Sequence, residues 1–142
     1  MPAQFSDTGG RVAYDYAVLR IVPRPERGEF INAGVVLHCP ERRYLEALVH
    51  FDEPRLAALW PGADLEQLRE NVEILPRICR GDRNAGPIAA LPPRERFHWL
   101  VAPRSAAIQV SPVHCGICDA PETALNDLFR RLVGPPGEPP GC

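Results

Sequence analysis

Residues 30–38 read Phe-Ile-Asn-Ala-Gly-Val-Val-Leu-His, a nearly continuous apolar run that is rich in β-branched side chains. A run of this length and composition predicts a central β-strand. Residues 12–22 before it and residues 43–51 after it alternate between apolar and polar side chains, and each segment predicts a further strand. The connections over residues 24–29 and 39–42 are short, which favours an antiparallel meander of the three strands.

The chain after the third strand is predicted to be mainly helical. Asp52 is placed to cap a short helix that carries Pro54 in its first turn. Asp64 and Gln67 resemble a capping box, and the apolar residues that follow recur at helical spacing. Pro76 is expected to end or kink this second helix.

Four further elements complete the prediction. In chain order they are a helical turn over residues 86–91, a helix over residues 93–101, a fourth strand over residues 107–111 and a last helix over residues 121–132. Asp119 and Glu122 resemble a second capping box at the start of the last helix, and Gly134 is placed to close it. Together the elements predict an α+β fold, an antiparallel three- to four-stranded sheet with helices packed over one face.

Length and composition fit one domain of ordinary globular type, since the chain has 142 residues, of which 45% are hydrophobic and 24% charged. We expect a flexible N-terminus over residues 1–11, a single α+β domain over residues 12–133 and a disordered tail rich in Pro and Gly over residues 134–142. No apolar run approaches the ~18 residues of a membrane-spanning helix, and residues 1–11 lack the apolar core of a signal peptide. With five cysteines, an odd number, reduced thiols and a cytoplasmic location are expected.

Charge and motif content exclude several classes of function. The formal net charge of −2 argues against a dominant nucleic-acid or membrane footprint. All 16 basic residues are arginine, so a Walker-type phosphate loop and a lysine nucleophile are excluded. The motifs G-x-S-x-G, G-x-G-x-x-G and H-E-x-x-H are also absent. No cofactor is therefore predicted.

A first polar cluster is predicted at one end of the first hairpin. Arg20 interrupts the first strand and Asn32 the second, while Arg27 and Glu29 lie in or beside the loop between them. These residues can bind an anion, and Glu29 is also a candidate catalytic group. The alternative is a structural network in which Arg20 pairs with Glu29 and Asn32 bonds to the loop backbone.

A second polar cluster is predicted around the fourth helix and the loop after it. Arg96 and Arg104 flank a helix end, an arrangement that suits bidentate contacts to a phosphate or a carboxylate. His114 can serve as a general acid or base, with Arg104 as a further catalytic candidate. The alternative is a solvated helix face followed by a packed loop.

Residues 114–118 read His-Cys-Gly-Ile-Cys, a Cys-x-x-Cys pair preceded by a histidine. Such a pair can ligate zinc or act as a dithiol. A structural zinc site needs four ligands, however, and the sequence has no second pair of this kind. His114, Cys115 and Cys118 are therefore weak candidates for metal binding, and packing is the favoured role for the two cysteines.

Two longer segments resemble a known family. The first segment, residues 14–37, contains Tyr-Asp-Tyr-Ala-Val-Leu-Arg-Ile-Val-Pro and then Arg-Gly-Glu-Phe-Ile-Asn-Ala-Gly-Val-Val-Leu. The second segment, residues 95–116, contains Glu-Arg-Phe-His-Trp-Leu-Val-Ala-Pro-Arg-Ser and then Ile-Gln-Val-Ser-Pro-Val-His-Cys-Gly. Together they resemble the bacterial family known as domain of unknown function 3037, over nearly the whole of residues 12–133. The resemblance implies a small stand-alone bacterial domain without an established activity, of a kind often encoded beside a HipA-like kinase-fold protein.

The first functional hypothesis is a non-enzymatic interaction or regulatory domain that acts with a protein partner. It follows from the missing catalytic motifs, the small size and the resemblance to a family without an assigned activity. A HipA-like kinase-fold protein is a candidate partner. Trp60, Phe97 and Trp99 are candidate interface residues, although packing is the expected role of most of them.

The second hypothesis is a small-molecule-binding domain or enzyme for a phosphorylated or carboxylated ligand. It requires four side chains to converge in one cleft: Arg20, Arg96, Arg104 and His114. Nucleic-acid binding through an arginine face is a weaker, third hypothesis, because the one basic run lacks interleaved aromatic residues. The oligomeric state is open at this point.

Overall fold

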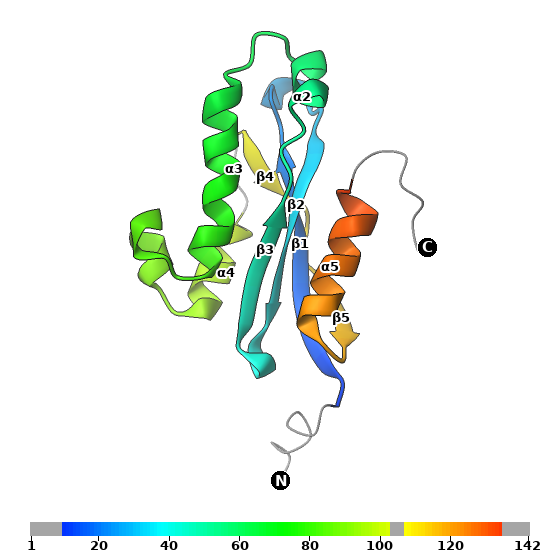
Figure 1. The fold of residues 1–142 in the computed structure, drawn as a ribbon, viewed down its shortest axis with the longest axis vertical. Helices are drawn as coiled ribbons and strands as arrows, with labels where there is room; N and C mark the ends of the chain where they lie inside the picture. Colours follow the sequence, from blue (N-terminus) through cyan, green and yellow to red (C-terminus); the bar gives the residue numbers. More distant parts are fainter. Residues whose placement is uncertain (1–9, 103–106, 135–142) are drawn as a thin grey trace.

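In the computed structural model, residues 10–102 and 107–134 are described, so the expectations for residues 1–9 and 135–142 lie outside the described residues. The described part forms a five-stranded antiparallel sheet with helices on both sides (Figure 1). Its strands are β1 (Val12–Ile21), β2 (Ile31–Cys39), β3 (Tyr44–Val49), β4 (Ile108–Val110) and β5 (His114–Cys118). Its helices are α2 (Glu53–Leu59), α3 (Leu65–Cys79), α4 (Pro93–Leu100) and α5 (Pro121–Leu132).

The strand β1 is the centre of the sheet topology. The order is β3-β2-β1-β4, and β5 also pairs with β1, beyond the end of β4. The last residues of β1 pair with β4 and its first residues pair with β5, all antiparallel. The predicted meander and the predicted fourth strand are confirmed. The strand β5 was not predicted, because its residues His-Cys-Gly-Ile-Cys include a single β-branched side chain.

The α+β class is confirmed, but the expectation that the helices cover one face is wrong. The helices α3 and α4 pack on one face of the sheet against Ala17 and Val36. The helix α5 packs on the opposite face against Val35 and Leu37. The physical reason is that Val35, Val36 and Leu37 have no exposed surface, so β2 is an apolar strand that needs cover on both sides.

A bulge at Ala33 changes the direction of the side chains along β2. Leu19 of β1 pairs with Gly34, whereas the next residue, Arg20, pairs with Asn32, so Ala33 is an extra residue on β2. Beyond the bulge, Ile31 and Ala33 pack in the core under α2 and α3. Asn32 therefore lies on the face that α5 covers.

Two helix starts follow the predicted caps, one helix continues past a proline, and one expected capping box is not formed. The carboxylate of Asp52 accepts from the backbone N–H of Arg55 at 3.2 Å, and Asp64 likewise caps α3. Pro76 lies inside α3, which continues to Cys79, so the helix does not end at the proline. The helix α5 begins after Ala120 without a side-chain cap, so the capping box expected from Asp119 and Glu122 is not formed.

No helix among the described residues is both long and apolar enough to cross a membrane.

We expect Gly34→Ala to destabilise the sheet. A Cβ at this position would lie 2.6 Å from the carbonyl oxygen of Leu48 and 2.9 Å from Cγ1 of Val49. The substitution should lower the free energy of unfolding by about 1–3 kcal/mol, the usual cost of overpacking a tight core, as measured by urea denaturation. Gly62→Ala is the control, because among the described residues its Cβ would meet only Trp60 Nε1, at 3.7 Å. Equal stability of the two variants would contradict the close packing at Gly34.

Candidate functional site

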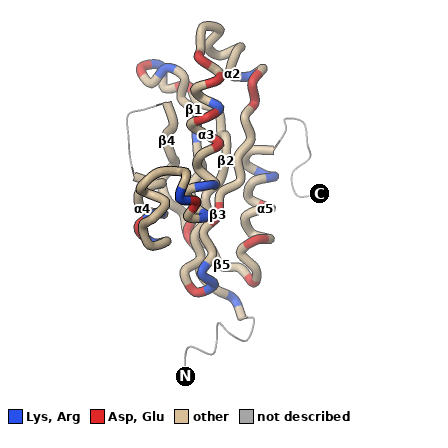
Figure 2. Tube along the Cα trace, turned by 60° about the vertical axis from the view of Figure 1, so that its left-hand side comes forward, with Lys and Arg blue, Asp and Glu red and all other residues tan. Residues whose placement is uncertain are grey.

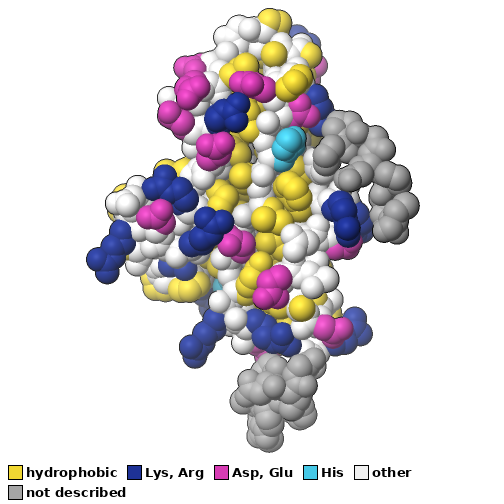
Figure 3. Space-filling view, in the orientation of Figure 1, with side chains coloured by type: hydrophobic (Ala, Val, Ile, Leu, Met, Phe, Trp, Pro, Cys, Tyr) yellow, Lys and Arg dark blue, Asp and Glu magenta, His cyan; other side chains and the backbone are white. Residues whose placement is uncertain are grey.

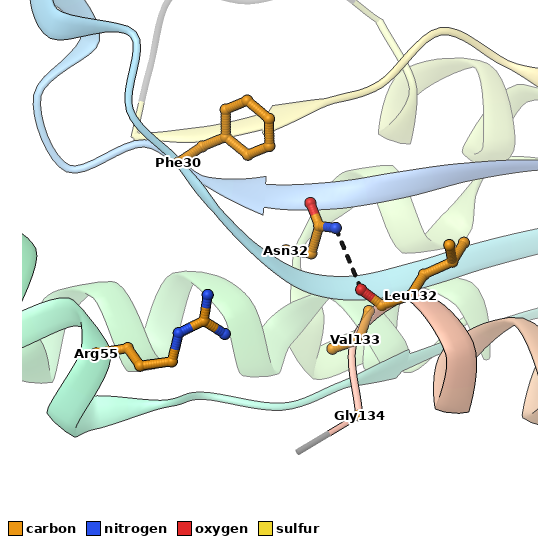
Figure 4. Close-up of a pocket in the computed structure, with 6 residues that line it drawn as sticks. All are labelled: Phe30, Asn32, Arg55, Leu132, Val133 and Gly134. Atoms are coloured by element: carbon orange, nitrogen blue, oxygen red, sulfur yellow. Dashed lines mark hydrogen bonds between the residues drawn. The ribbon is translucent and has the colours of Figure 1, made fainter. Parts of the chain in front are cut away.

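A pocket of about 410 Å³ lies where the β1–β2 hairpin, α2 and the end of α5 meet (Figure 4). The hairpin contributes Phe30 and Asn32, and α2 contributes Arg55. The end of α5 and the residues after it contribute the rest of the wall: Leu132, Val133 and Gly134. Three elements that are distant in the sequence thus form one cavity, of the size that small-molecule sites usually have.

Asn32 connects the hairpin to the last turn of α5. Its Nδ2 donates a hydrogen bond to the carbonyl oxygen of Leu132 at 3.2 Å, as the dashed line in Figure 4 shows. Its Oδ1 is buried and has no hydrogen-bond partner among the described residues. Asn32 therefore fixes the end of α5 against β2 and keeps an unused acceptor beside the pocket.

Arg20 lies next to this pocket, opposite Asn32 on β1. Its guanidinium carbon lies 4.3 Å from the centre of the Phe30 ring, in a cation–π contact. Its Nε is buried without an acceptor among the described residues. The structure therefore brings two residues of the first predicted cluster together, Arg20 and Asn32.

The other two members of that cluster form a separate ion pair. Arg27 Nε lies 2.9 Å from Glu29 Oε1, and both side chains are about half exposed at the tip of the hairpin. The hydrogen bond from Arg27 lowers the pKa of Glu29, so this carboxylate is ionised at neutral pH. Glu29 thus pairs with Arg27 rather than with Arg20, and neither residue lines the pocket.

Two members of the second predicted cluster, Arg96 and His114, are described, and they lie on different elements. Arg96 lies in α4, where its Nη1 donates to the carbonyl oxygen of Leu91 at 2.7 Å and holds the preceding loop. Arg104 lies outside the described residues. His114 is on β5, with its ring 5.3 Å from that of Tyr16. Because Tyr16 and Arg20 share a face of β1 four residues apart, His114 and Arg20 are separated by roughly 13 Å along the strand.

The two cysteines of the Cys-x-x-Cys pair point to opposite faces of the sheet. Successive side chains of a strand alternate in direction, so His114 and Cys118 share one face of β5 and Cys115 lies on the other. Cys118 packs beside the core under α5, whereas Cys115 is exposed. The three side chains therefore cannot surround one metal ion, and the two thiols are not placed to form a disulfide with each other.

Sequence analysis missed a polar row that crosses the other face of the sheet. Asp15 of β1 pairs with His38 of β2 on one side and with Cys115 of β5 on the other. His38 is only 5% exposed and its ring lies 5.1 Å from that of Phe97. Burial lowers the pKa of His38, which keeps the ring neutral at neutral pH. Asp15 and His38 are polar residues in apolar strands, the same signal that identified Arg20 and Asn32.

The thiol of Cys115 is not an activated nucleophile. Its hydrogen bond to Asp15, together with the charge of that carboxylate, raises the pKa of Cys115. A raised pKa lowers the fraction of thiolate, which is the reactive form. The row of Cys115, Asp15 and His38 therefore lacks the nucleophile–base contact of a cysteine hydrolase, because the carboxylate lies between the other two groups.

We expect Asp15→Asn to make Cys115 more reactive. Removing the carboxylate removes the main cause of the raised pKa, so thiolate should form at a lower pH. The measurement is the rate of alkylation by iodoacetamide against pH, followed at the Cys115 peptide by mass spectrometry. Buried Cys79, whose pKa burial raises to about 12, is the internal control and should stay slow in both proteins. If the pH at which the alkylation rate of Cys115 is half-maximal is unchanged or higher in Asp15→Asn, the contact with Asp15 is contradicted.

Three strands have only one neighbour in the sheet, β3, β4 and β5, and the edges of β3 and β5 differ in how they are protected. On β3, Glu46 Oε1 accepts from the backbone N–H of Ala47 at 3.1 Å, and Glu46 Oε2 lies 3.2 Å from Arg80 Nε. Figure 3 shows the apolar stripe along β3 with charged side chains on both sides. On β5, no side chain among the described residues caps the edge in this way, and Ile117 is 61% exposed. The strand β5 thus has an unprotected edge, unlike β3.

A second groove adjoins this edge. It has a volume of about 460 Å³ and lies between the end of β5 and one side of α5. Cys118, Ala120 and Ala124 are the small side chains in its wall, and Asp119 is the carboxylate nearest to β5 in the chain. The edge of β5 therefore has an exposed apolar side chain on one face and a groove near its end on the other.

Comparison with known proteins identifies the family of the chain. Residues 16–133 match the family described as "Protein of unknown function (DUF3037)". No curated protein and no solved structure matches the chain. The family match covers residues 16–37 of the first segment that carried the resemblance and all of the second, and it extends from within β1 to the end of α5. The chain therefore belongs to the DUF3037 family of proteins of unknown function.

Proposed function

We propose that this chain is a bacterial, cytoplasmic interaction domain that acts with a protein partner and not as an enzyme by itself. The observation that carries the proposal is the unprotected edge of β5 with the exposed side chain of Ile117. An open strand edge presents unpaired backbone N–H and C=O groups and is a template for pairing with another chain. On the opposite side of the sheet, the outer strand β3 has a backbone N–H of its own bonded to Glu46.

In the proposed complex, the partner adds an extended segment to β5. Backbone hydrogen bonds supply affinity in this mode of recognition, and side chains on alternate faces supply specificity. On one face the partner side chains would pack on Ile117 and beside Cys115. On the other face they would reach the groove of about 460 Å³ between β5 and α5. Val113, just before β5, is also exposed and extends the apolar surface.

Catalysis is less well supported than partner binding. Acid–base chemistry requires groups within hydrogen-bond reach of a common substrate atom. Arg20 lies beside Phe30 on one face of the sheet, Arg96 is bonded to the backbone before α4, and His114 stacks on Tyr16. In Figure 2 acidic and basic residues are interspersed along the tube, a distribution that does not favour a nucleic acid as the partner.

A HipA-like kinase-fold protein from the same organism is the first partner to test, because the family resemblance suggests it. The experiment is co-expression of this chain with that protein, followed by size-exclusion chromatography of the purified complex. A stoichiometric complex supports the proposed function. A chain that elutes alone, with no stoichiometric protein recovered from source cells either, would refute it.

We expect Ile117→Lys to weaken the complex by about tenfold or more, because a charge on a strand edge opposes pairing. Ile117 is largely exposed, so the melting temperature of the isolated chain should stay unchanged. Asn84→Lys adds the same charge at an exposed position outside the sheet and is the matched control. If the two variants bind the partner equally well, β5 is not the interface even though a partner exists.

A further inference from the structure

We propose that the pocket between the hairpin, α2 and α5 binds a small amino carboxylate, of which a free α-amino acid with an apolar side chain is the simplest. The pocket places the guanidinium of Arg55 on one side and the carbonyl end of α5 on another, with Phe30 in its wall. This site is independent of β5 and of the proposed partner. Three features of the pocket define the ligand: its positive side, its carbonyl side and its apolar side.

The positive side is Arg55, which is placed to take the ligand carboxylate. Figure 4 shows its side chain extending from α2 toward the pocket. Its only ion pair among the described residues is a long one, with Nη1 3.9 Å from Asp52 Oδ2. Asp52 already accepts from the backbone N–H of Arg55 as the cap of α2. The guanidinium fork is therefore available for a bidentate contact with a carboxylate.

The carbonyl side is the last turn of α5, which is placed to take the ligand ammonium. The N–H groups of Val133 and Gly134 both donate to the carbonyl oxygen of Phe129, both at 2.9 Å. Within the described part of the chain, the later carbonyl groups of the helix therefore have no helical donor, and that of Leu132 accepts from Asn32 alone. The negative end of the helix dipole adds to their preference for a cation.

The apolar side explains why the ligand should carry a hydrophobic group. Phe30 is 45% exposed and Leu132 is 37% exposed, although both are large apolar side chains, and both line the pocket. Arg20 stacks on the ring of Phe30 at 4.3 Å and holds it in place. An apolar ligand group in the pocket would cover these two side chains.

The bulge at Ala33 supports a binding role for this corner of the fold. Bulges re-aim side chains and are over-represented beside functional sites. Here the bulge turns Asn32 out of the core under α2 and toward the end of α5. The buried Oδ1 of Asn32 and the buried Nε of Arg20 are both without partners among the described residues. Polar groups left unpaired in this way mark a site with hydrogen-bonding capacity that the fold itself does not use.

The test is binding of L-leucine to the full chain, measured by isothermal titration calorimetry and by shifts of the Asn32 side-chain amide in NMR spectra. L-Valine and L-phenylalanine vary the apolar group. 4-Methylpentanoate lacks the ammonium and 3-methylbutylamine lacks the carboxylate, so each should bind at least tenfold more weakly than leucine. If none of the three amino acids binds at millimolar concentration, the proposal is refuted. If 4-methylpentanoate binds as well as leucine, the site is a general anion site and the amino-carboxylate assignment is wrong.

The matched variants are Arg55→Gln and Arg24→Gln. Arg55→Gln removes the proposed carboxylate partner and should weaken leucine binding at least tenfold. Arg24 lies in the hairpin loop, pairs with Glu26 at 3.2 Å and does not line the pocket, so Arg24→Gln should bind leucine as the unchanged chain does. Both arginines are about half exposed, so both variants should fold. Equal leucine affinity in the two variants would overturn the role of Arg55.

Discussion

The whole architecture depends on the burial of β2 on both of its faces. Val35, Val36 and Leu37 are successive residues that alternate between the two sides of the sheet, and none of them has exposed surface. A strand of this kind is stable only if each face has its own layer of helices. The chain after β3 supplies α3 and α4 for one face, and then returns through β4 and β5 to place α5 on the other. Gly34 allows β3 to approach β2 closely within this double layer.

The bulge at Ala33 resolves a conflict between this burial and the polar side chain of Asn32. Without an extra residue, Asn32 would continue the face of Gly34 and Val36 and point into the core under α3. A buried amide there would need partners for all its polar atoms. The bulge instead sends Ile31 into the core and Asn32 to the end of α5, where a helix carbonyl accepts its N–H. The same shift places Asn32 in the wall of the pocket that Arg55 also lines.

Much of the fold could be predicted from local patterns, but less of the site could. Strands and helices follow from apolar spacing, and two of the caps from a single aspartate each. Which face a helix covers depends on long-range packing that periodicity does not encode, and β5 has no pattern of its own. Arg20 and Asn32 were found because polar residues in apolar strands stand out. Arg55 was missed because an arginine on a short helix has the pattern of an ordinary solvated face.

The helix α5 lies between the two proposed sites, with its first residues near β5 and its last residues in the wall of the pocket. It begins three residues after β5 and ends at the pocket, and its 12 residues span roughly 18 Å. Leu125 and Leu128 fix it to the buried face of β2, so it is a rigid element between the strand edge and the ligand pocket. A ligand at its carbonyl end makes no contact with the β5 edge. Any effect of the ligand on partner binding would therefore require α5 to shift as a body over β2, which the close packing of Leu125 and Leu128 opposes.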